Sequence, residues 1–301
     1  MPQEKLVYLQ ELLAIIPKHK GTEKLQADLK SKISKIKDAL ISQKKSKGSG
    51  GSWFQVERQG AGQVVLVGLP NCGKSSVLNT LTNAHADVAL YPFTTTLPQV
   101  GMMDYENIKI QIVDTPPLHD DAPAWLFGIY RNSNFLLIIL DGAGDLFQDF
   151  ENINYLLNNK NISIRPNGSG DVKQALIMLN KIDKIIDASL KERFINQLKN
   201  EFRIIPFTTN NTADVDIIKR EIFEKLNLIR VYTKKIGYPV NKDEPVVLKK
   251  GLTIIDAAEH IHKDFKKNLK FARLWNDAGY AGQRVEKNHV LIDGDVIEFH
   301  V

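Results

Sequence analysis

The stretch Val64-Val-Leu-Val-Gly-Leu-Pro-Asn-Cys-Gly-Lys-Ser75 decides the fold of this chain. Its first four residues predict a short buried strand, and the residues after Ser75 begin a helical pattern. The glycine-rich turn between them lets consecutive backbone N–H groups converge on an anion at the helix N-terminus. The stretch therefore predicts a phosphate-binding loop, to which Lys74 adds a positive charge. The residues expected to contact a nucleotide are Gly68, Pro70, Asn71, Cys72, Gly73, Lys74, Ser75 and Ser76.

Short apolar runs rich in β-formers alternate with helical patterns from about residue 62 to residue 228. The runs are Val64–Val67, Ile108–Val113, Phe135–Leu140, Ala175–Leu179 and Ile204–Ile205. This alternation is typical of a mainly parallel sheet wrapped by helices, so the expected fold class is α/β. In open sheets of this kind, ligands bind at the carboxyl ends of the strands.

A second motif, Asn180-Lys-Ile-Asp183, directly follows the run Ala175–Leu179. The Asp183 carboxylate can accept hydrogen bonds from both N1 and N2 of guanine. Adenine lacks both donors, and a site built on such bonds can reject the wrong ligand by a factor on the order of 10⁴. Asn180, Lys181 and Asp183 therefore predict binding of GTP and GDP. The pair Thr208-Thr209 is expected to supply a last backbone contact to the guanine oxygen.

A magnesium site is expected beside the phosphate loop. Asp114 ends the run Ile108–Val113 and can reach the metal through water, while Ser75 offers its hydroxyl. The run Thr94-Thr-Thr96 lies between the two motifs, and Thr95 is the predicted metal ligand, with either neighbour as the alternative. Ser75, Thr95 and Asp114 are thus the expected magnesium ligands.

Composition excludes several classes of protein. The only cysteine is Cys72, so no disulfide can form within the chain and a reducing compartment is expected. The first residues, MPQEKLVYLQ, lack the apolar core of a signal peptide. The longest wholly apolar run, Phe135–Leu140, is far too short to span a membrane. We therefore expect a cytoplasmic protein that does not contact a membrane.

The net charge of +5 is unevenly distributed over three segments. Residues 1–50 carry a net charge of +6, residues 51–228 carry −4, and residues 229–301 carry +3. Basic ends around an acidic middle favour contact with a polyanion. Lysines that only solvate a helix face would give the same count, so both interpretations stand.

The same three segments are the predicted domains. Residues 1–50 form a basic helical arm, in which helical apolar spacing stops at Pro17 and resumes after Thr22. Residues 51–228 form the nucleotide-binding domain. Residues 229–301 show a few β-like runs and one amphipathic helix from Thr253 to about Phe265, which predicts a small α+β domain of β-grasp type.

The motifs as a set resemble the Obg-related branch of translation-factor GTPases, and specifically the developmentally regulated GTP-binding (DRG) family. Within the nucleotide-binding domain the resemblance rests on GLPNCGKSS (68–76), YPFTTTLPQVG (91–101), DTPPL (114–118) and NKID (180–183). Outside it, PKHKGTEKLQADLKSKISKIKDAL (17–40) is similar to that family's basic arm. RVYTKKIGYPV (230–240) and EPVVLKKGLTIIDAAEHIHKDF (244–265) are similar to its C-terminal TGS domain. The resemblance implies a partner in the translation machinery, either the ribosome or RNA.

The chain departs from the family in two places. Family members often carry an extra domain where this chain has only the short segment Asn159–Asp171. The third motif usually ends in a glycine whose N–H touches the γ-phosphate, but here Pro117 has no N–H to give. Leu118 stands where Ras-type enzymes orient water with glutamine. Slow hydrolysis, driven by positioning and charge neutralisation, is therefore expected.

Lys74, Thr95 and Asn71 are the predicted catalytic residues. Asn71 stands where related GTPases hold a potassium ion near the β- and γ-phosphates, so K⁺ is considered as a cofactor beside Mg²⁺. An asparagine that only shapes the turn would explain the same residue equally well.

These observations predict a slow GTP hydrolase that acts as a translation-associated switch. The ribosome or RNA would bind through the basic arm and the TGS domain, with a protein cofactor as a further partner. The alternative is a nucleotide-binding RNA or ribosome module with little or no hydrolysis, which Pro117 favours. A metabolic P-loop kinase is disfavoured by the NKID motif and by the lack of an obvious acceptor site.

Overall fold

The computed structural model describes residues 56–82, 87–88, 98–165, 172–185, 187–209 and 211–300. The predicted basic arm, the threonine run with Thr95, and residues 166–171 of the short segment Asn159–Asp171 lie outside these residues.

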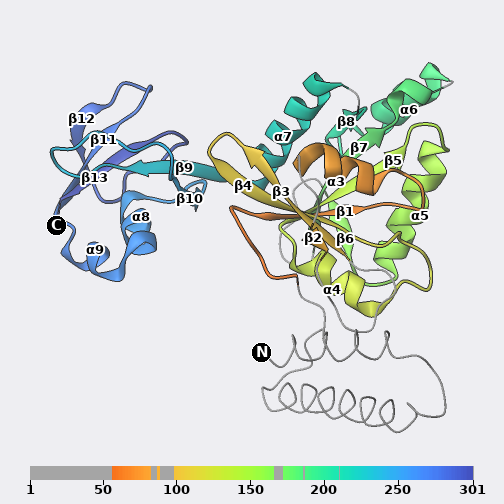
Figure 1. The fold of residues 1–301 in the computed structure, drawn as a ribbon, viewed down its shortest axis with the longest axis horizontal. Helices are drawn as coiled ribbons and strands as arrows, with labels where there is room; N and C mark the ends of the chain where they lie inside the picture. The colour runs from red at the N-terminus through yellow and green to blue at the C-terminus, as the bar shows by residue number, and fades with distance from the viewer. Residues whose placement is uncertain are drawn as a thin grey trace, which may run out of the picture. The chain divides into compact units, whose positions relative to one another are not determined.

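The first sheet has eight strands, in the order β2-β3-β4-β1-β5-β7-β6, with β8 paired to β7 (Figure 1). The strands are β1 (Gln63–Val67), β2 (Asp87–Val88), β3 (Gln99–Tyr105), β4 (Ile108–Asp114), β5 (Phe135–Asp141), β6 (Ser163–Arg165), β7 (Val172–Asn180) and β8 (Ile204–Pro206). All pairs are parallel except those that involve β3. The predicted α/β class is confirmed, and each of the five predicted strands is present.

The strand β3 was not predicted, and its packing explains why. Its sequence, Gln-Val-Gly-Met-Met-Asp-Tyr, has a glycine near its centre, which weakens the strand signal. A Cβ atom at Gly101 would lie 2.6 Å from Thr82 Cγ2, so glycine is needed for the close approach of helix α3. A tertiary contact, not local propensity, therefore sets this residue.

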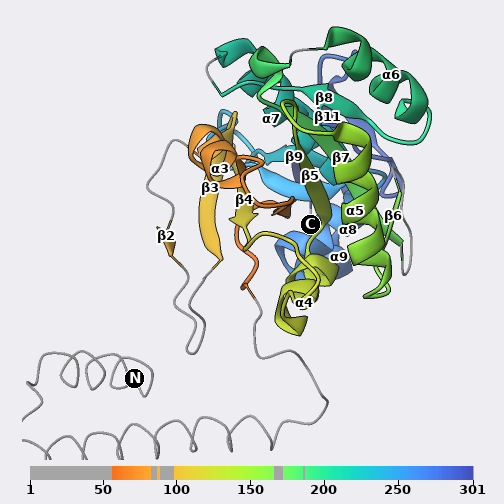
Figure 2. The same cartoon turned by 90° about the vertical axis from the view of Figure 1, so that its right-hand side faces the viewer.

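Helices cover both faces of the first sheet (Figure 2). One face packs on α4 (Ala124–Asn132), α5 (Leu146–Asn158) and α6 (Ala188–Leu198), and the other on α3 (Lys74–Thr82) and α7 (Thr212–Leu226). Along β1, Val65 and Val67 belong to the first core, whereas Val64 and Leu66 belong to the second. Burial on both faces accounts for a continuous apolar run in place of an alternating one.

The second sheet has five strands, in the order β10-β9-β13-β11-β12. They are β9 (Leu228–Thr233), β10 (Val246–Lys249), β11 (Phe271–Trp275), β12 (Ala281–Val285) and β13 (Val296–His300). One face packs on helix α8 (Ile254–Ile261), whose Ile254, Ala257 and Ala258 are buried against β9, β11 and β13. A short helix, α9 (Lys263–Asn268), follows.

The single helix predicted from Thr253 to about Phe265 is wrong, because the chain forms two helices there. His262 is extended, with φ of −164° and ψ of 139°, and ends α8. Its Nδ1 atom then accepts a hydrogen bond from the Asp264 N–H at 3.2 Å, which caps α9. The side chain that breaks the first helix thus starts the next one.

The two sheets are joined through helix α7 by a single residue, Asn227, whose φ of 54° reverses the chain. On strand β9, Arg230 forms ion pairs with Glu106, in the turn between β3 and β4, and with Asp293. In the same turn, Asn107 Nδ2 donates to the Tyr232 hydroxyl at 2.7 Å. The β3–β4 turn therefore holds the first strand of the second sheet.

Within the described residues, no helix is both long enough and apolar enough to cross a membrane.

Candidate nucleotide-binding site

The predicted phosphate loop lies between β1 and α3 and is shaped by residues in the left-handed region. Asn71 has φ of 64° and Gly73 has φ of 94°. A Cβ atom at Gly68 would lie 2.5 Å from Cys72 Sγ and 2.7 Å from the Ile139 carbonyl oxygen. Glycine is therefore required at both ends of the turn. Gly68 is required because a side chain would not fit, and Gly73 is required because its backbone is left-handed.

Lys74 opens helix α3 and turns its ammonium into the loop. Nζ donates to the carbonyl oxygens of Gly68, at 3.1 Å, and Leu69, at 3.3 Å, and only 6% of the residue is exposed. The Cys72 thiol is buried beside it, and this burial raises the pKa of Cys72. The Cys72 thiol therefore stays protonated and unreactive. The Lys74 ammonium is held by the loop carbonyls, so the loop is suited to anion binding and not to thiol chemistry.

Ser75 and Asp114 form the core of the predicted metal site. Ser75 Oγ donates to Asp114 Oδ2 at 2.6 Å, which joins the loop to the end of β4. The other carboxylate oxygen, Asp114 Oδ1, is buried without a hydrogen-bond partner. Burial raises the pKa of Asp114, and the Ser75 hydrogen bond opposes that rise. A hydroxyl beside an unpaired carboxylate oxygen is a donor set that fits Mg²⁺.

The motif at the end of β7 reaches the phosphate loop directly. Asn180 Nδ2 donates to the Cys72 carbonyl oxygen at 2.8 Å, and a Cβ atom at Gly73 would collide with the same amide. Lys181 Nζ donates to the Asn71 carbonyl oxygen at 2.7 Å. Two motifs more than 100 residues apart in sequence thus form one site.

Asp141 is a residue of this site that the sequence analysis missed. Its carboxylate accepts from Lys181 Nζ at 2.6 Å and orients that side chain. Asp141 ends β5, where it lies beside Asn180 in the parallel register. The signal was present, since an acid that follows the apolar run Phe135–Leu140 occupies the carboxyl end of a central strand.

The predicted base-recognition residues also lie together. Asp183 is exposed, and its Oδ1 atom accepts from the Thr208 hydroxyl at 3.1 Å. The Ile182 N–H donates to the Phe207 carbonyl oxygen, so the loops after β7 and β8 are joined by backbone as well. Thr209 follows, half-buried. The Asp183 carboxylate is therefore available at the surface, with Thr208 holding its direction.

The segment after Asp114 is anchored to the core. Thr115 Oγ1 donates to the Leu66 carbonyl oxygen at 2.8 Å. Leu118 is fully buried, and its N–H donates to the Gly68 carbonyl oxygen at 3.0 Å. Leu118 thus fills the core and presents no polar group to water, while Pro117 has no N–H. Neither residue can orient a water molecule or bind a phosphate through a side-chain or backbone donor.

Comparison with known proteins places this geometry in a family. A model described as a 50S ribosome-binding GTPase matches residues 63–181, and a TGS domain model matches residues 229–301. An uncharacterised GTP-binding protein of Methanocaldococcus jannaschii is 28% identical over 362 residues, covering 98% of this chain and 92% of that protein. The developmentally-regulated GTP-binding protein 2 homolog of Dictyostelium discoideum is 26% identical over 356 residues, covering 98% of each chain. This chain is a DRG-like GTP-binding protein.

The DRG-like chain is shorter than the alignments to these relatives, which extend over more positions than its 301 residues. The relatives therefore contain segments that have no counterpart here. A GTP binding protein from Pyrococcus horikoshii shares the fold, with a TM-score of 0.52 and 16% identity over 79% of this chain and 99% of that one.

Proposed function

We propose that this DRG-like chain binds GTP and GDP at the site between β1, β4 and β7, hydrolyses GTP slowly, and acts as a switch on the ribosome or its RNA. The hydrogen bond from Asn180 Nδ2 to the Cys72 carbonyl oxygen carries the proposal. It fixes the base-recognition loop at the phosphate loop, so that one nucleotide can occupy both.

Each part of the site has a role in binding. Backbone N–H groups at the start of α3 bind the phosphates, and the Lys74 ammonium neutralises charge on the β- and γ-phosphate oxygens. Asp183 selects guanine by accepting from N1 and N2. Lys181 is held between Asn71 and Asp141, where its aliphatic stem can cover one side of the base.

Magnesium would be held by Ser75 and Asp114, with Thr95 as the proposed third protein ligand. The metal neutralises charge on the β- and γ-phosphate oxygens when it is bound. Ser75 contributes its hydroxyl and Asp114 its buried, unpaired oxygen. Asn71, at the exposed rim of the loop, is proposed either to hold K⁺ or to serve only the turn.

Catalysis in this proposal rests on positioning and charge neutralisation by Lys74, Thr95 and Asn71. Pro117 and Leu118 supply no group that orients the attacking water, which is why hydrolysis is slow. The basic segment 1–50 and the TGS domain are proposed to bind the ribosome or RNA, with a protein cofactor as a further partner. A cytoplasmic location is proposed to go with this role.

Nucleotide titration tests the binding part of the proposal. We expect calorimetry to give tight GDP and GTP binding, no ADP or ATP binding, and weaker GTP binding when Mg²⁺ is removed. Phosphate release, measured with and without ribosomes and in K⁺ or Na⁺, tests the catalytic part. Equal affinity for adenine and guanine nucleotides would contradict the assignment of the base pocket.

A second candidate function has a specific observation in its favour. Because the Leu118 N–H is engaged by the Gly68 carbonyl oxygen, no backbone donor beside Pro117 can replace the missing glycine N–H. A nucleotide-binding module with little or no hydrolysis fits this arrangement. Phosphate release no faster than that of free GTP, even with ribosomes present, would favour this second function.

A further inference from the structure

The outer face of the second sheet, opposite α8, carries planar and cationic side chains. Along β11, Ala272 and Leu274 are buried in the core, whereas Phe271, Arg273 and Trp275 alternate with them and point to the other side. The α8 side is thus a closed core, and the outer side is the available surface.

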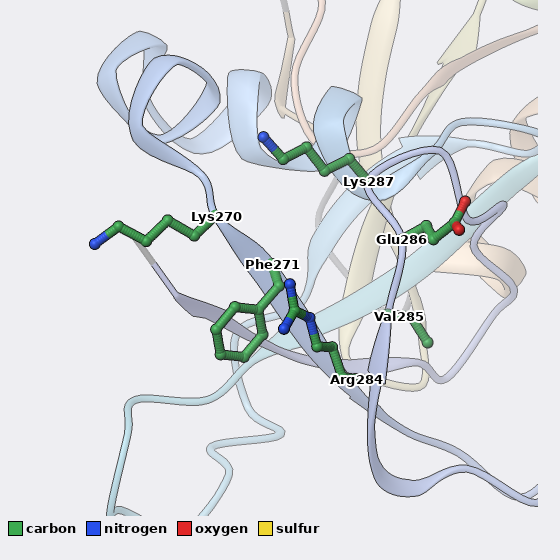
Figure 3. A pocket seen from close by; sticks show the side chains of 6 residues that line it. All are labelled: Lys270, Phe271, Arg284, Val285, Glu286 and Lys287. Carbon is green, nitrogen blue, oxygen red and sulfur yellow. The ribbon is translucent and has the colours of Figure 1, made fainter.

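Three side chains from adjacent strands form a stack on this face. The rings of Phe271, on β11, and His300, on β13, are 4.2 Å apart at an angle of 12°. The Arg284 guanidinium, on the edge strand β12, lies 4.4 Å from the Phe271 ring centre. Figure 3 shows the guanidinium directly beside that ring. Because Arg284 is exposed on an edge strand, its planar group is the accessible end of the stack.

A second planar group lies further along the same face. Trp275 packs against Gly282 of β12, where a Cβ atom would lie 2.9 Å from the indole, and the Lys234 ammonium lies 4.9 Å from its ring centre. The face therefore presents two aromatic platforms, each with a cation against it.

Two arginines on this face occupy neighbouring positions on adjacent strands. Arg273 and Arg284 lie directly opposite each other on β11 and β12. Like charges in such a cross-strand pair are destabilising. The neighbouring acid, Glu298, is already bound by Lys234 and His300. Among residues 211–300, neither arginine has a carboxylate partner, so the pair is free to bind an external anion.

The stack borders a hollow with more basic than acidic residues. Its volume is about 450 Å³, and it is lined by Lys270, Phe271, Arg284, Val285, Glu286 and Lys287. Glu286, the acid in that set, points its carboxylate away from the Phe271–Arg284 pair (Figure 3).

We propose that the outer face of β13, β11 and β12 binds single-stranded RNA, with phosphates on the Arg273–Arg284 pair and an unpaired base stacked on the Arg284 guanidinium. Unpaired bases offer π-faces to planar side chains, whereas a duplex hides them within its own stack. An acidic peptide would satisfy the two arginines but would not use the planar groups. The combination of an exposed guanidinium plane and two unpaired arginines therefore favours single-stranded RNA.

This inference rests on the proposed ribosome or RNA role and names the surface and the class of RNA. It does not depend on the nucleotide site, because none of its residues belongs to that site. GDP binding, measured in the same preparations, therefore separates a failure of the RNA face from a failure of the nucleotide assignment.

The test uses the full chain with a fluorescent 12-nucleotide single-stranded oligouridine, and a duplex RNA of the same length for comparison. Arg284→Ala and Arg273→Ala should each lower the affinity for the single strand about fivefold or more. Each should also reduce the slope of log affinity against log salt by about 0.7, as expected for one lost phosphate contact. Arg284→Lys keeps the charge but loses the plane, so it should recover the salt slope and only part of the affinity.

The control variant is Arg220→Ala, which removes the same charge from an exposed position on α7. It should change RNA affinity less than twofold. The inference is overturned if the Arg273 and Arg284 variants bind the single strand as wild type does, or if they lose duplex binding equally. It is also overturned if a polyglutamate peptide of the same length competes as well as RNA, or if the full chain does not bind the single strand at all.

Discussion

At the scale of single residues, two positions carry the proposed nucleotide selectivity. Asp183 presents an exposed carboxylate whose direction is held by Thr208, and Pro117 removes one backbone donor near the expected γ-phosphate. In the proposed function, Asp183 selects the base, and Pro117 weakens the distinction between GTP and GDP.

Replacing Asp183 should abolish base selection. Asp183→Ala removes the acceptor for two guanine donors, and bonds to charged groups are worth about 1.5–3 kcal/mol each, so GDP affinity should fall about 100-fold or more. Calorimetry with GDP and ADP measures both affinity and selectivity. Lys74→Ala should instead weaken phosphate binding and keep the preference for guanine. Asp216→Ala, an exposed change on α7, is the control, and an unchanged GDP affinity in Asp183→Ala would refute the base pocket.

Pro117 should leave GTP and GDP with similar affinities. The missing hydrogen bond corresponds to about 1.5–3 kcal/mol, or roughly tenfold or more in the preference for GTP. Pro117→Gly should therefore raise the affinity for a non-hydrolysable GTP analogue relative to GDP. The neighbouring buried proline gives a matched control, Pro116→Gly, which should not change the ratio. A strong preference of the wild type for the GTP analogue would contradict this explanation.

At the scale of elements, helix α8 begins with a capping box. Asp256 Oδ2 accepts from the Thr253 N–H at 2.8 Å and from the Thr253 hydroxyl at 2.6 Å. These bonds lower the pKa of Asp256 below its ordinary value of 3.8. A carboxylate whose pKa is lowered by folding contributes stability at pH values above its ordinary pKa. This contribution is lost as the pH falls through the lowered pKa.

Asp256→Ala should therefore destabilise the second sheet by about 1 kcal/mol at neutral pH and by less at pH 3, which lies below the ordinary pKa. Urea denaturation at both pH values, followed by the fluorescence of Trp275 in a background with Trp53 and Trp125 replaced by Phe, measures the difference. Asp277→Ala, an exposed change in the turn after β11, is the control and should show no such pH dependence. An equal cost at both pH values would show that packing, not the charged cap, is responsible.

The junction between the two sheets depends on Arg230, which is 8% exposed. Its guanidinium lies 5.2 Å from the Phe223 ring centre and forms ion pairs with Glu106 and Asp293. Arg230→Ala should cost about 2 kcal/mol, less than a fully buried pair because both acids are partly exposed. Hydrogen exchange should become faster in residues 104–108 and 228–233. Arg203→Ala breaks a more exposed pair with Glu221 and is the control, for which exchange in those two segments should stay unchanged.

At the scale of the whole molecule, charge is separated along the chain. Residues 1–50 carry +6 and residues 229–301 carry +3, on either side of a segment with −4. Deleting residues 1–50 should flatten the dependence of RNA or ribosome affinity on salt, because fewer counterions would be released. Binding measured at several salt concentrations tests this, with GDP affinity as the control for folding. An identical affinity and salt dependence after the deletion would show that residues 1–50 do not contribute to RNA or ribosome binding.

The sequence by itself determined the α/β class, five of the eight strands of the first sheet and the positions of the main motifs. The phosphate loop, Asn180–Asp183 and Asp114 were recognised because each lies at the end of an apolar run, and that pattern is local. The strand β3 and the helix break at His262 were not predicted. Gly101 is required by the close packing of Thr82, and His262 caps the helix that follows it, so neither feature has a local sequence signal.

Only the tertiary structure decided which distant side chains meet. Asp141 joins Lys181 through the parallel register of β5 and β7, and Leu118 is withdrawn into the core while its N–H binds Gly68. The Arg273–Arg284 pair likewise exists only because β11 and β12 are paired in this register. Local patterns fix the strands and loops, but the register and packing of those strands fix the distances, and chemistry depends on distance.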